Sequence, residues 1–255
     1  MTSGDKPSKK HSSTRWLLIL LAILPVLLLL GREIAWGQTI GTFRVVDLAD
    51  LFILAPLYLL ILLYLFFRIL DYRAPRWLLV MYLVSAFIFM YGHAIHFTGN
   101  SLHTYVTEVK DYEHAMPRDV FEMIFFLDEE FSHWVLFIGT TGLICCWLLY
   151  DQLVKAPPVL PNTMWIILPF GVMYGFVLAY ALIEARSLPF TFLIVGAPAI
   201  TWIYLWRRSA QGVWEFTKSR PFTKLVSIML FSLLAGLGLW YLAFGGFPQP
   251  SEVGL

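Results

Sequence analysis

The chain has 255 residues, of which 59 % are hydrophobic and 14 % are charged, and its formal net charge is +1. Soluble domains are closer to half apolar and a quarter charged, which excludes an ordinary soluble fold. A net charge near zero provides no electrostatic field for nucleic acid, so we expect no nucleic-acid partner. The composition instead predicts an all-α polytopic membrane protein.

Apolar runs long enough to cross a bilayer core of about 30 Å recur along the chain. They predict a bundle of about seven transmembrane helices in a single domain at residues 16–244, with spans near 16–30, 51–70, 77–97, 131–150, 165–185, 190–206 and 225–244. A basic tail at residues 1–15 precedes this domain, and a short C-terminal tail at residues 245–255 follows it.

The first run also has features of a secretory signal peptide, whose removal would leave six spans. Residues 31–38 make a poor cleavage site, so we expect the first helix to be retained. The basic loop before the last span predicts an interfacial helix around Trp214. Cys145 and Cys146 are neighbours in an apolar run, where adjacent helical side chains point apart, so we expect no disulfide.

The distribution of lysine and arginine predicts the orientation of the spans. With the N-terminus inside the cell, the inner segments contain thirteen of these residues and the outer segments contain five. We therefore expect an N-in, C-out protein of the plasma membrane. The end of the third span and the start of the fourth helix then lie toward the outer face.

Five of the six histidines lie within residues 91–134, together with a dense set of carboxylates. His93, His96, Asn100 and His103 follow spacings of three, four and three, which place them on one helix face if the helix continues through Gly99. Ionisable side chains inside apolar spans are costly and mark functional sites. This window is therefore the candidate site.

The fourth helix is expected to begin where Asp119 and Glu122 form a capping box after Pro117. Glu122, Glu129 and His133 follow spacings of seven and four, so they also share one face. The third and fourth helices should be antiparallel neighbours, and a rise of about 1.5 Å per residue then sets their register. The register predicts three levels of facing side chains: His133 with His93, Glu129 with His96 and Asn100, and Glu122 with His103.

Facing imidazoles and carboxylates are suitable ligands for a divalent metal, and we favour zinc over iron. The candidate ligands are His93, His96, His103, Glu122, Glu129 and His133. Glu129 is also the candidate general base. Asp128 should point about 100° away from the face of Glu129 and is a candidate catalytic residue that supports a ligand from behind. His114 lies in a polar loop, where we expect it to be solvated.

These residues predict an integral-membrane metalloenzyme that hydrolyses a lipid or another amphiphile. The arrangement is similar in architecture to seven-span zinc hydrolases of the ceramidase and adiponectin-receptor class. Those families place a histidine pair in the last span, whereas the last three spans here contain no histidine, so no family residue is transferred. The alternatives are a non-haem iron redox enzyme, a transporter or metal- or haem-handling protein, a proton path, and interfacial histidines bound to lipid phosphates. The sequence does not define the oligomeric state.

Overall fold

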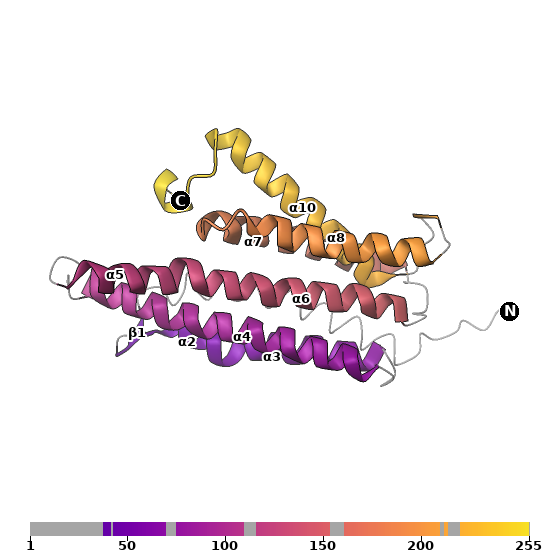
Figure 1. The fold of residues 1–255 in the computed structure, drawn as a ribbon, viewed down its shortest axis with the longest axis horizontal. Coiled ribbons are helices and arrows are strands. Elements are labelled where there is room, and N and C mark those ends of the chain that lie inside the picture. Colours follow the sequence, from indigo (N-terminus) through magenta and orange to yellow (C-terminus); the bar gives the residue numbers. More distant parts are fainter. Residues whose placement is uncertain are drawn as a thin grey trace.

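The structure is a computed structural model that describes residues 38–41, 43–69, 75–109, 116–153, 161–209, 212–213 and 220–254. These residues form a helical bundle with one short β-hairpin (Figure 1). The tail at residues 1–15, the predicted span at 16–30, the predicted helix around Trp214, and His114 lie outside the described residues.

The described elements follow one another as a hairpin and then a series of helices, three of which contain a π-helical turn. In chain order they are β1 (Thr39–Ile40), β2 (Phe43–Arg44), α2 (Val45–Ala49), the π-helix η1 (Asp50–Leu54), α3 (Ala55–Ile69), α4 (Arg76–Thr104), the π-helix η2 (Tyr105–Val109), α5 (Arg118–Phe125), the π-helix η3 (Phe126–Phe131), α6 (Ser132–Leu153), α7 (Pro161–Glu184), α8 (Phe190–Arg208), α10 (Pro221–Phe244) and the 3₁₀-helix η4 (Pro250–Val253).

Six helical segments within the described residues are long and apolar enough to cross a membrane. They are Asp47–Tyr64, Arg76–Thr107, Arg118–Leu153, Ile167–Glu184, Phe190–Arg208 and Phe222–Phe244. Each coincides with one of the predicted spans between residues 51 and 244. Apart from the short hairpin, the prediction of a helical protein with helices suited to span a membrane is therefore confirmed for this part of the chain.

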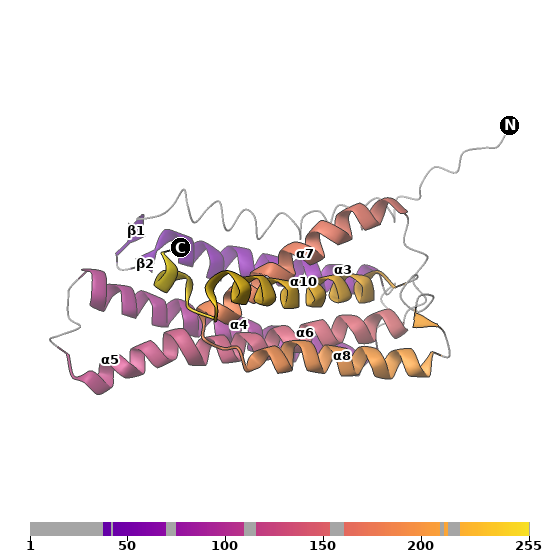
Figure 2. The same cartoon turned by 90° about the horizontal axis from the view of Figure 1, so that it is seen from above.

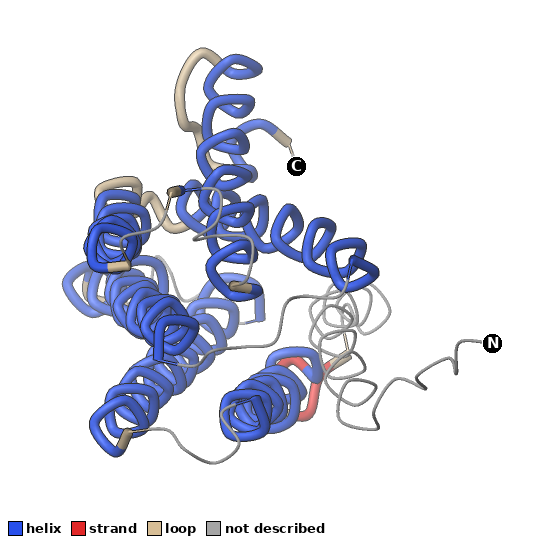
Figure 3. The backbone as a smooth tube through the Cα atoms, turned by 90° about the vertical axis from the view of Figure 1, so that its right-hand side faces the viewer, coloured by secondary structure: helices blue, strands red, loops and turns tan. Residues whose placement is uncertain are grey.

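Helices α3, α4, α6 and α8 run roughly along one common axis, and α8 lies beside α6 (Figures 1 and 2). The hairpin, the last turn of α4 and the start of α5 lie at one end of the bundle, which we call the hairpin end (Figure 1). The helix that leads to the C-terminus leans away from the others in the end-on view (Figure 3). Its last turns are accordingly exposed, as at Leu242, which is 79 % exposed.

Glycines bring α4 and α6 into backbone contact. A Cβ atom on Gly139 would lie 2.5 Å from the Phe89 nitrogen, and one on Gly92 would lie 2.7 Å from the Leu136 nitrogen. The small residues Gly139, Gly142, Ala235 and Gly238 in the apolar runs predict close helix packing, and for Gly139 this prediction is confirmed. A packing role for Gly238 is wrong, since nothing lies within 4 Å of its Cβ position. The two helices of the candidate site are therefore held closer together than side chains of ordinary size would allow.

Candidate functional site

The histidine face of α4 is continuous. The helix runs unbroken from Arg76 to Thr104, so it passes through Gly99 and keeps His96 and His103 on one side. These two imidazoles are seven residues apart, which is two turns, and Gly99 lies between them on the same face. A shallow gap flanked by two imidazoles therefore faces the fourth helix.

The fourth helix comprises α5, η3 and α6, and its π-helical turn η3 lies opposite Gly99 of α4. The backbone N–H of Ser132 donates to the carbonyl of Leu127, which is the i→i+5 pattern of a π-helix. Residues five apart, such as Asp128 and His133, share a face in such a turn. The prediction that Asp128 points away from α4 is therefore wrong, because it assumed 3.6 residues per turn throughout.

Asp128 lies between the two histidines of α4. Its Oδ1 atom is 3.2 Å from His96 Nδ1, and its Oδ2 atom is 3.2 Å from His103 Nδ1. A Cβ atom on Gly99 would lie 2.8 Å from the Asp128 Cα atom. Glycine at position 99 is thus what lets the backbone of η3 approach α4 and places the carboxylate between both rings.

The Asp128 carboxylate is almost fully buried, with 2 % of its side chain exposed. Each of its two oxygens faces an imidazole Nδ1 atom at 3.2 Å, Oδ1 facing His96 and Oδ2 facing His103. A buried carboxylate costs free energy unless hydrogen-bond donors or a cation compensate it. The site is therefore arranged for positive charge, carried either by the two imidazoles or by a bound cation.

His133 lies behind His96. Their ring centroids are 4.7 Å apart, and the His133 side chain is buried. His133 Nδ1 is 2.9 Å from the carbonyl oxygen of Glu129, to which a protonated Nδ1 donates. Its hydrogen-bonded Nδ1 fixes the ring, as is typical of histidines whose Nε2 atom is left for a ligand or a proton.

Glu129 completes a group of possible metal ligands. One ligand atom from each of His103, Asp128 and Glu129 lies within 4.8 Å of the other two. Ligands of a tetrahedral zinc ion, bound at about 2.1 Å, are roughly 3.4 Å apart, so small side-chain movements would close this set around an ion. Glu184, at the end of α7, is near enough to Glu129 to interact with it electrostatically.

The remaining predicted ligands lie at the margin of this group or outside it. His93 is partly buried, with its ring 4.7 Å from that of Phe89. Glu122 is exposed and forms an ion pair of 2.7 Å with Arg118. The predicted capping box is wrong, because the N-cap of α5 is Pro117 and no side chain caps the helix.

The predicted levels of facing side chains also need correction. His133 contacts His96 rather than lying level with His93, and Glu129 groups with His103 and Asp128. The same shift along α4 is present further into α6, where Gly92 lies against Leu136. Asn100 donates to Asp47 at 3.4 Å.

Ser132 is a site residue that the sequence analysis missed. Its side chain is fully buried, and its hydroxyl donates to the Asp128 carbonyl oxygen. The more useful missed signal is the pattern His96-x-x-Gly99-x-x-x-His103, since a glycine midway between two histidines on one face leaves space for a side chain from a neighbouring helix.

Comparison with known proteins gives no relative. No protein-family model matches the chain, and neither a curated protein nor a solved structure matches it. The function must therefore be inferred from the chemistry of the site.

Proposed function

We propose that this protein is an integral-membrane metalloenzyme that binds a divalent metal between α4 and η3, with zinc favoured over iron. The observation that carries the proposal is the buried Asp128 carboxylate between His96 and His103, with a Glu129 oxygen in the same group. Imidazole and carboxylate together are the usual ligands of zinc and of non-haem iron.

The residues have separate roles in this proposal. His103, Asp128 and Glu129 are the metal ligands, since their ligand atoms already lie together. His96 holds the second oxygen of Asp128, and His133 packs against the ring of His96. A divalent metal held there supplies Lewis acidity, which polarises an ester or amide carbonyl and makes water a better nucleophile near neutral pH. Hydrolysis is therefore the favoured reaction.

The depth of the site supports an amphiphilic substrate. His96 is twenty residues from the start of α4 at Arg76, a rise of about 30 Å, which equals the thickness of a bilayer core. His133 is twenty residues from the end of α6 at Leu153, so the second helix gives the same depth. The site thus belongs at the boundary of hydrocarbon and headgroups, where the polar group of a lipid lies.

The full topology is part of the proposal. Seven spans with the N-terminus inside and the C-terminus outside place this boundary at the outer face of the plasma membrane. The lysine and arginine distribution supports this orientation, with thirteen residues in the inner segments and five in the outer ones.

Elemental analysis of the detergent-purified full chain tests the proposal. The wild-type protein should contain about one equivalent of zinc or iron, and Asp128→Asn and His103→Ala should each lose it. Glu122→Gln is the matched control, because Glu122 is a carboxylate of the same helical segment that lies outside the group. Absence of metal after reconstitution, or equal metal content in all variants, would sink the proposal. Iron in place of zinc would move the reaction to redox chemistry.

The hydrolytic activity needs its own assay. Vesicles containing ester-linked or amide-linked lipids should release free fatty acid with the wild-type protein and not with Asp128→Asn. A chelator should abolish the release, and added zinc should restore it.

A further inference from the structure

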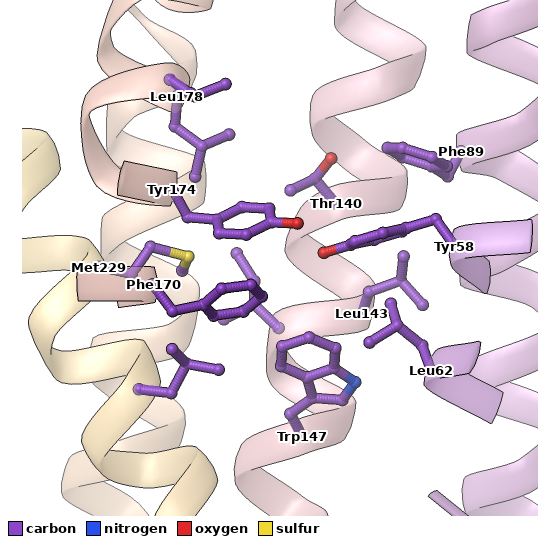
Figure 4. A pocket seen from close by; sticks show the side chains of 13 residues that line it. Tyr58, Leu62, Phe89, Thr140, Leu143, Trp147, Phe170, Tyr174, Leu178 and Met229 are labelled. Carbon is purple, nitrogen blue, oxygen red and sulfur yellow. The ribbon is translucent and has the colours of Figure 1, made fainter. Parts of the chain in front are cut away.

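A cavity of about 210 Å³ lies within the bundle, between α3, α4, α6, α7 and α10. Aromatic and aliphatic side chains line it, among them Phe89, Trp147 and Met229 (Figure 4). Tyr58 and Tyr174 point toward each other across it, with ring centroids 6.1 Å apart. An apolar cavity of about 150 Å³ already stays dry and takes up a small hydrocarbon, so this one favours an apolar guest.

The cavity lies on the same helix faces as the candidate metal site. On α4, Phe89 lines the cavity and also contacts His93, four residues further along the same face. On α6, Thr140 and Ile144 line the cavity, and they continue a stripe that begins at His133 with spacings of three and four. Phe137 lies in this stripe between His133 and Thr140, with its ring 6.1 Å from that of His133.

The distance between the cavity and the site fits an amphiphile. Phe89 is seven residues from His96, and Thr140 is seven residues from His133, so both helices place the cavity about 10 Å deeper in the membrane than the site. The site lies at the depth of headgroups and the cavity lies at the depth of hydrocarbon chains. A molecule with a polar group at one end and an alkyl chain at the other would occupy both.

We propose that the cavity holds part of the hydrocarbon chain of the substrate while the group to be cleaved lies at the Asp128 cluster. This inference rests on the proposed function and makes the substrate a lipid with an alkyl chain. The cavity selects the chain, because almost all of its lining is apolar, and the Thr140 hydroxyl is already used in a 2.8 Å hydrogen bond to the Leu136 carbonyl.

Photochemical labelling of the full-length protein in lipid nanodiscs tests the inference. The probes are two palmitic acid analogues, one with a diazirine near the methyl end and one with a diazirine near the carboxyl group. Mass spectrometry of the peptides should place the methyl-end label on cavity residues such as Tyr174 and Met229. The carboxyl-end label should fall near Glu129 and His133.

Two variants of α6 provide the matched pair. Thr140→Phe fills the cavity and should lower methyl-end labelling of its lining roughly tenfold, as expected when about two methylene groups lose their place. Ile138→Phe adds the same ring two residues away on a surface that is 46 % exposed, and should leave the labelling unchanged. Both variants should keep the wild-type metal content, which shows that they fold.

The outcomes separate this inference from the proposed function. Labelling spread over exposed residues, equal labelling in the two variants, or both diazirines reacting in the cavity would overturn the chain site and indicate ordinary bilayer lipid. Normal metal content would leave the proposed function standing in that case. If the wild-type protein contains no metal but the two probes still label the cavity and the Asp128 cluster as expected, only the proposed function is overturned.

Discussion

Two buried carboxylates, Asp128 and Asp151, lie at opposite ends of the same long helical segment, and they differ in what surrounds them. Asp151 is 2 % exposed, and its Oδ2 atom accepts a 2.6 Å hydrogen bond from the backbone N–H of Thr223. Thr223 is the third residue of α10, so Asp151 caps the N-terminus of that helix from another helix. Arg220 donates to the Asp151 carbonyl oxygen at 3.1 Å.

Asp128 is 1 % exposed but has no helix end to cap. Its neighbours are two imidazoles and a second carboxylate, all of which can change protonation or bind a metal. Buried charge is costly in both places. At Asp151 one carboxylate oxygen offsets that cost by accepting from the backbone N–H at the start of α10, near the positive end of the helix dipole. At Asp128 two imidazoles offset the cost instead of a helix end, which is why we assign function to that end.

The largest expected effect concerns metal binding. Asp128→Asn should lower the affinity for zinc by at least about 100-fold, because it replaces a charged ligand that two histidines position. Asp151→Asn should leave the affinity unchanged. Titration of the metal-free proteins with zinc in detergent measures both, and equal losses in the two variants would remove the distinction between the carboxylates.

The next effect concerns stability. Asp151→Ala should lower the free energy of unfolding by about 2 kcal/mol, because the buried Thr223 N–H loses its acceptor. Asp151→Asn should recover most of this loss, since an amide oxygen can still accept. Metal-free Asp128→Asn should change stability by less than about 1 kcal/mol. Thermal unfolding of the metal-free proteins in one detergent tests this, and a larger loss at Asp128 would mean a structural role.

The smallest effect concerns the glycines at the contact between α4 and the fourth helix. Gly99→Ala should reduce zinc affinity about tenfold, because the new methyl group would meet the Asp128 backbone at 2.8 Å and push the carboxylate away from His96 and His103. Gly139→Ala meets the Phe89 backbone at 2.5 Å, in the same helix pair but away from the site. It should lower the melting temperature with little effect on affinity. The opposite ranking in a zinc titration would contradict the close approach at Gly99.

Much of the fold was accessible from the sequence, since bilayer thickness dictates the length of an apolar run. The six predicted spans between residues 51 and 244 correspond to six long helices. The pairing of α4 with the fourth helix also followed from the short link between them. The packing glycines were harder, because whether a glycine faces a neighbouring helix or lipid depends on the rotation of the helix. Gly139 and Gly238 illustrate the two outcomes.

The candidate site could be predicted only in part. Its location was clear, since ionisable residues in apolar spans are rare. The orientation of Asp128 was not, because the π-turn at Phe126–Phe131 has no signature in residue type and changes which side chains of the helix share a face. That turn brings Asp128 onto the face of α4, while Glu129 stays in the same group. A spacing of five between buried polar residues, as from Asp128 to His133, is the trace that it leaves in the sequence.

The cap between Asp151 and Thr223 also imposes an order on biogenesis. Asp151 belongs to α6, and its partner N–H belongs to a helix that the ribosome completes about seventy residues later. Until α10 has been synthesised, the Asp151 carboxylate lacks this donor. Docking of α10 supplies the donor and completes the end of the bundle opposite the candidate site.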